Sequence, residues 1–97
     1  MDISESAREG HYMFAEAPDD LERERITCLE RMFDPATISR LERIGVGPGW
    51  ACLEVAAGGG SIAAWLGDRV GSRGSVLATD VNIRFLGHLQ RPVEVQT

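Results

Sequence analysis

The residues best suited to chemistry are two carboxylates on either side of a glycine run. Glu54 comes shortly before Gly58-Gly59-Gly60, and Asp80 follows at the end of the next apolar run. Glycines where a strand turns into a helix let a ligand approach the backbone closely, and amides at the start of that helix can face the ligand. A carboxylate at the end of the next strand can accept hydrogen bonds from both hydroxyls of a ribose. The spacing therefore predicts a binding loop for a ribose-containing ligand, with Glu54 favouring a cationic group beside it.

A strand, a helix and a second strand must position these residues, and the apolar pattern predicts all three. Residues 50–55 and 75–80 are short, largely apolar runs, typical of parallel strands covered on both faces. Between them, Ser61 can cap a helix whose apolar side runs from Ile62 to Val70. The three segments together have the length expected of a βαβ unit.

Further elements are expected on both sides of this unit. Downstream, Asn82 predicts the cap of another short helix that ends at Arg91-Pro92, and residues 93–97 alternate like the start of a third strand. Upstream, residues 18–45 predict two short helices separated at Asp34-Pro35, because proline fits the first turn of a new helix. The charged side chains of the first of these helices are interpreted as a solvated face: Glu22, Arg23, Arg25 and Arg31.

These elements predict an α/β fold, a partial Rossmann-like parallel sheet of about three strands preceded by two short helices. Residues 1–17 show no helical or strand period and are interpreted as an N-terminal arm. Residues 18–45 form the helical lead-in, and residues 46–97 form the βαβαβ unit.

Composition narrows the functional classes. The chain has 97 residues and a formal net charge of −5, which argues against a nucleic-acid binder because such a protein would present a basic face. No apolar run is long enough to cross a membrane, and the polar, acidic start is unlike a secretory signal. Cys28 and Cys52 lack metal-ligand spacing, so we expect no metal site and a reduced, cytoplasmic setting.

The segment from Leu53 to Ala63, LEVAAGGGSIA, resembles motif I of class I S-adenosylmethionine-dependent methyltransferases, which is an acid, any residue and then Gly-x-Gly-x-Gly. The run from Leu77 to Val81 resembles the motif that follows it, and residues 25–49 resemble the helical lead-in of small actinobacterial-type members. The likeness covers roughly residues 12–97.

The resemblance implies S-adenosylmethionine as cofactor and assigns a role to each matched residue. Gly58 and Gly60 would line its methionine part, and Glu54 would lie near its ammonium group. Asp80 would hold the ribose, and Val81 would cover one face of the adenine. The family's first glycine is Ala56 in this chain, which is acceptable if that residue has a negative φ and costly if φ is positive.

The resembled family builds a sheet of usually seven strands, of which this chain would supply three. We therefore expect the N-terminal portion of a methyltransferase for an unidentified small-molecule acceptor, truncated and weakly active or inactive. No catalytic residue can be nominated. The strand at residues 50–55 would have an open edge, which predicts self-association.

Other interpretations stay open. Gly58-x-Gly60-x-x-Ala63, with Asp80 about twenty residues further on, also fits the NAD(P) or FAD fingerprint. Glu54 favours the methyltransferase, because a carboxylate would repel a pyrophosphate. The remaining alternatives are a non-catalytic interaction module and a glycine-rich turn without a ligand.

Overall fold

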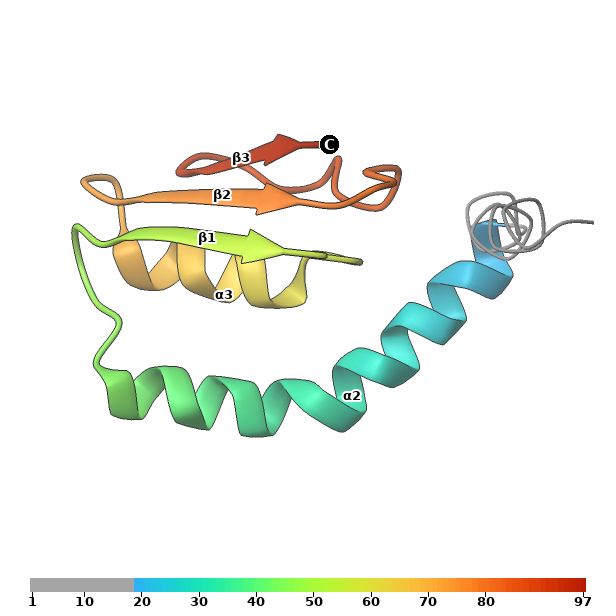
Figure 1. Cartoon of the computed structure of the whole chain (residues 1–97), viewed down its shortest axis with the longest axis horizontal. Coiled ribbons are helices and arrows are strands. Elements are labelled where there is room, and N and C mark those ends of the chain that lie inside the picture. Colours follow the sequence, from blue (N-terminus) through green and yellow to red (C-terminus); the bar gives the residue numbers. More distant parts are fainter. Residues whose placement is uncertain (1–18) are drawn as a thin grey trace, which may run out of the picture.

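The computed structural model describes residues 19–97, so the predicted N-terminal arm lies outside the described residues. Its elements, labelled in Figure 1, are α2 (Asp19–Ile44), β1 (Ala51–Val55), α3 (Ser61–Val70), β2 (Ser75–Thr79) and β3 (Val93–Gln96). Within the described part of the chain, no helix is both long and apolar enough to cross a membrane.

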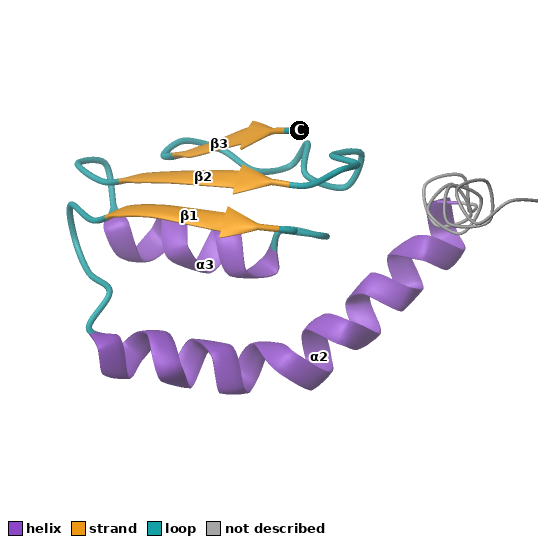
Figure 2. Ribbon diagram, viewed as in Figure 1, coloured by secondary structure: helices purple, strands orange, loops and turns teal. Residues whose placement is uncertain are grey.

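The sheet confirms the predicted α/β class. Its three strands are all parallel and lie in the order β1-β2-β3 (Figure 2), with Leu53 of β1 in register with Leu77 of β2 and Leu77 in register with Glu94 of β3. Parallel strands place their carboxyl ends at one edge of the sheet, so the loops after β1 and β2 emerge side by side.

The core lies between α3 and one face of the sheet. Ala63, Leu66 and Val70 of α3 are buried against Val76 and Ala78 of β2. Successive strand residues point to opposite faces, and among residues 19–97 no helix covers the other face of β1. Leu53 and Val55 on that face are 65% and 73% exposed.

The helical lead-in is one helix rather than the two that the sequence predicts. α2 runs for 26 residues with Pro35 inside it, and Figure 1 shows it bent in its middle. Proline removes one intrahelical hydrogen bond and pushes against the preceding turn, which bends a helix that neighbouring contacts keep together. The Thr37 hydroxyl donates to the Phe33 carbonyl oxygen across the same region (3.1 Å), a bond that also favours bending.

The short helix predicted after Asn82 is wrong. The Asn82 side chain accepts a hydrogen bond from the Arg84 amide (3.1 Å), which closes a local turn in place of a helix start. Two further turns follow, from Leu86 N–H to the Ile83 carbonyl (3.0 Å) and from Leu89 N–H to the Leu86 carbonyl (3.2 Å). Apolar side chains of this segment are nonetheless buried, and Leu86 is only 1% exposed.

Contacts hold α2 against the α/β unit at both of its ends. Near its C-terminus, Arg69 of α3 lies over Trp65 and donates to Glu42 (3.0 Å). Near its N-terminus, Arg84 lies 3.4 Å from Asp19. The N-terminal half of α2 therefore faces the loops that follow β1 and β2.

Candidate functional site

A cavity of about 470 Å³ lies where the loops after β1 and β2 face the N-terminal half of α2. Apolar side chains of α2, of the first turn of α3 and of the loop after β2 form part of its wall, including Ile26, Phe33, Ile62 and Phe85. Its charged lining is mainly acidic. Five carboxylates face two arginines, namely Glu22, Glu30, Asp34, Glu54 and Asp80 against Arg25 and Arg84.

The fold brings together five of the six residues that the sequence assigns to a cofactor. Glu54, Ala56, Gly58, Asp80 and Val81 all line the cavity.

Gly60 does not line the cavity and has a structural role. It is the N-cap of α3 at φ +85°, and a Cβ there would lie 3.1 Å from the side chains of Leu86 and Leu89. Ser61, the predicted cap, is instead the first residue of the helix, and the N-cap glycine makes no side-chain capping hydrogen bond.

The loop after β1 has left-handed backbone at Ala56 and Gly58 as well as at Gly60. Gly58 has φ +61°, and a Cβ there would meet nothing within 4 Å, so its backbone borders open space. Ala56 also has φ +61°. Ala56 is therefore in the conformation that is costly for an L-residue.

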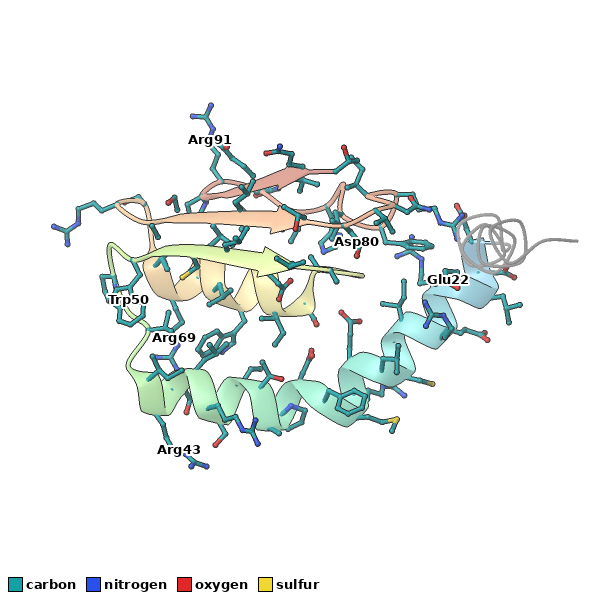
Figure 3. The ribbon with its side chains drawn as sticks, in the orientation of Figure 1. Glu22, Arg43, Trp50, Arg69, Asp80 and Arg91 are labelled. Carbon is teal, nitrogen blue, oxygen red and sulfur yellow. The ribbon has the colours of Figure 1, made fainter. Side chains whose placement is uncertain are left out.

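Asp80 joins the loop after β1 to the loop after β2. One carboxylate oxygen accepts from the Gly58 amide (2.8 Å), and the other accepts from the Asn82 amide (3.1 Å). Figure 3 places Asp80 at the carboxyl end of the sheet, on the side where Glu22 of α2 lies. A carboxylate oxygen has two lone pairs, so Asp80 retains the capacity to accept hydroxyl donors while it holds both loops.

Glu54 is a half-buried acid in an unfavourable environment. Burial, together with the negative charges of Asp34 and Glu30, raises the pKa of its carboxyl to about 7. Its Oε1 atom is buried and accepts no hydrogen bond from any residue in the range 19–97. An unpaired buried carboxylate is destabilising unless a donor or a cation approaches it.

Sequence reasoning missed the contribution of α2. Glu22, assigned to a solvated face, is only 6% exposed and lines the cavity. It accepts hydrogen bonds from Arg25, which lower the pKa of the Glu22 carboxyl. The helical spacing of the acids at positions 22, 30 and 34 could have indicated one acidic side, but local patterning does not show which element that side would face.

Glu30 makes the most direct contact between α2 and the glycine loop. Its Oε2 atom accepts from the Ser61 amide at the start of α3 (3.2 Å). A Cβ on Gly59 would lie 3.1 Å from the same oxygen and 2.8 Å from Cγ2 of Ile26. Glycine at position 59 therefore lets α2 approach the loop closely.

Among residues 19–97, no group of three or more His, Cys, Asp or Glu side chains is arranged to hold a metal ion.

No protein-family model, no curated protein and no solved structure matches this chain.

Proposed function

We propose that the cavity binds S-adenosylmethionine and that the chain is a unit of a class I methyltransferase acting on a small-molecule acceptor. The observation that carries this proposal is the buried, unpaired Glu54 oxygen at the wall of an acidic cavity beside the glycine loop. A sulfonium nucleoside with an ammonium group is a cation that can compensate this charge.

The charge of the cavity favours a cationic ligand over a dinucleotide. Opposite charges about 4 Å apart attract by about 4 kcal/mol at an effective dielectric near 20, and like charges repel by as much. With five acids against two arginines in the lining, a sulfonium or ammonium group gains from this field. The same field would repel a pyrophosphate and weaken its binding.

The other parts of the ligand have suitable neighbours. Asp80 retains lone pairs for the ribose hydroxyls, and Val81, which lines the cavity and is 77% exposed, offers an apolar surface for the adenine. The open space in front of Gly58 leaves the backbone accessible to the methionine part. The cavity volume of about 470 Å³ lies within the range common for small-molecule sites.

When bound, S-adenosylmethionine supplies an already activated methyl group. The residues of this chain would hold the nucleoside, orient it through Asp80 and compensate its charge through Glu54. Orientation of this kind is the main protein contribution when the cofactor carries the reactive bond.

Isothermal titration calorimetry tests the proposal by comparing S-adenosylmethionine, its neutral thioether product S-adenosylhomocysteine, and NADH. We expect the sulfonium compound to bind and NADH to bind far more weakly. Glu54→Gln should weaken the sulfonium compound more than the thioether, because only the former carries the extra charge. Glu94→Gln is the matched control, because Glu94 is an exposed strand glutamate outside the cavity. It should leave the affinities for both compounds unchanged. Absence of heat from S-adenosylmethionine at millimolar concentration would overturn the proposal.

A second candidate is a non-catalytic interaction module that pairs with a second copy of itself. Its support is the exposure of Leu53 and Val55 on an edge strand, an arrangement that favours association. Sedimentation velocity over a range of concentrations should then show a dimer that Leu53→Lys converts to monomer. A monomer at every concentration contradicts this candidate.

A further inference from the structure

We propose that Glu30 determines the ligand class of this cavity, because its carboxylate keeps phosphate-bearing nucleotides away from the start of α3. The inference deepens the proposed function, since it names the residue that would make the site selective for a cationic nucleoside. It assigns a role to a residue of α2, far in sequence from the glycine run.

The position of the carboxylate is defined by two contacts. Glu30 Oε2 accepts from the Ser61 amide (3.2 Å) across 31 residues of sequence. The same oxygen would lie 3.1 Å from a Cβ on Gly59, so it also packs against the glycine loop itself. The carboxylate thus stands at the N-terminus of α3, directly beside the loop.

This is the place that an anionic ligand would need. The N-terminus of a helix attracts anions through its unpaired amides and its dipole, and dinucleotide-binding folds use it for the pyrophosphate. Here a carboxylate of the chain accepts from the amide of Ser61. A phosphate that entered would lie beside this negative charge, and they would repel each other.

The surrounding groups reinforce the effect. The amide of Gly58, at the other end of the glycine run, donates a hydrogen bond to the carboxylate of Asp80 (2.8 Å). Glu54 and Asp34 add negative charge to the same cavity, and Arg25 on α2 is hydrogen-bonded to Glu22. The amides of Gly58 and Ser61 therefore already donate hydrogen bonds to carboxylates of the chain.

Glu30→Gln separates the charge from the contact. A glutamine oxygen can still accept from the Ser61 amide, so α2 keeps its attachment to the loop while the negative charge is removed. Glu30→Ala removes both. Glu24→Gln is the matched control, because Glu24 lies on the same half of α2, is exposed and does not line the cavity.

The experiment titrates ADP-ribose and S-adenosylmethionine by calorimetry into the parent chain and the three variants, with circular dichroism as the check of folding. We expect ADP-ribose to bind Glu30→Gln at least tenfold more tightly than the parent, and Glu24→Gln to match the parent. Unchanged ADP-ribose affinity in both folded Glu30 variants overturns the inference. If neither Glu30 variant folds, the affinities of the parent chain for the two ligands test the inference. ADP-ribose binding as tight as that of S-adenosylmethionine overturns the inference, and its absence supports it.

The two proposals fail in different ways. If S-adenosylmethionine binds the parent but ADP-ribose affinity does not respond to Glu30, only the inference is wrong. If S-adenosylmethionine binds no variant while ADP-ribose gains affinity in Glu30→Gln, the proposed function is wrong and the role of Glu30 stands.

Discussion

Ala56 offers the sharpest test of the loop geometry, because the structure gives this alanine a left-handed backbone with φ +61°. In that conformation the Cβ of an L-residue crowds the neighbouring carbonyl, whereas glycine has no Cβ. Ala56→Gly should therefore stabilise the folded chain. Its neighbour Ala57 provides the matched control, since it does not share the positive φ and packs against the core.

The size of the effect follows from two opposing quantities. Left-handed backbone costs an L-residue about 1–2 kcal/mol, and the greater freedom of glycine in the unfolded chain offsets about 0.4–1 kcal/mol of the gain. Ala56→Gly should thus raise the free energy of unfolding by roughly 0.5–1 kcal/mol. Ala57→Gly should lower it by a similar amount, because only the unfolded chain gains freedom and a packed methyl group is lost.

Thermal unfolding followed by circular dichroism measures both changes. A domain of this size shifts its midpoint by about 4–8 °C per kcal/mol, so the two variants should differ by several degrees in opposite directions. Urea unfolding at fixed temperature checks that the dependence of the free energy of unfolding on urea concentration is unchanged. A change in the urea midpoint then reports a change in stability. A thermal midpoint of Ala56→Gly below that of the parent would refute the left-handed backbone of Ala56, and so would an equal fall of the midpoint in both variants.

Two further predictions concern Glu54 and Gly74. Burial raises the pKa of the Glu54 carboxyl from 4.5 to about 7 in the folded chain, so the folded state binds a proton more tightly and should lose stability as pH rises from about 4.5 to about 7. Urea unfolding across this range should show a loss in the parent that Glu54→Gln lacks; parallel pH profiles would contradict the assignment. Gly74→Ala should destabilise the fold by about 1–3 kcal/mol, because its Cβ would lie 2.4 Å from Cβ of Val70 and 2.7 Å from the Trp50 carbonyl oxygen. Gly87→Ala, with nothing within 4 Å, is the control for that measurement, and equal thermal midpoints for the two alanine variants would contradict the packing at Gly74.

The parts of the fold that the sequence predicts well are those with a local physical signal. The runs at 50–55 and 75–80 are largely apolar, and they form β1 and β2 with bounds within one residue of the prediction. The helix begins at Ser61, one residue earlier than a cap at that position predicts, and ends at Val70, just before the glycine that breaks it. The position of a strand and the buried side of a helix are encoded in such short windows, but the predicted cover on both faces of β1 is wrong, since Leu53 and Val55 are exposed.

The errors arise where distant contacts outweigh local preference. Asp34-Pro35 predicts a helix boundary, yet contacts at both ends of α2 keep it continuous and bent. After Asn82 the apolar spacing suits a helix, but the side chain of Asn82 closes a turn instead. Propensity is a weak guide when tertiary contacts of this kind oppose it.

The candidate site was predictable only in part, for the same reason. The glycine run and Asp80 lie in adjacent loops because parallel strands end at one edge, which the pattern predicts. The Glu30 contact with Ser61 spans 31 residues, and no local period indicates it. The approach of Glu30 and Asp34 to Glu54 likewise depends on where α2 lies relative to the loops.

NMR titration of S-adenosylmethionine into the ¹⁵N-labelled chain tests directly whether the cavity binds this nucleoside. We predict saturable shifts of the amides of Gly58, Ser61 and Asn82, which line the cavity, with little change near His88 in the separate hollow beside β3. No shift at saturating ligand, or shifts confined to the region of His88, would contradict it.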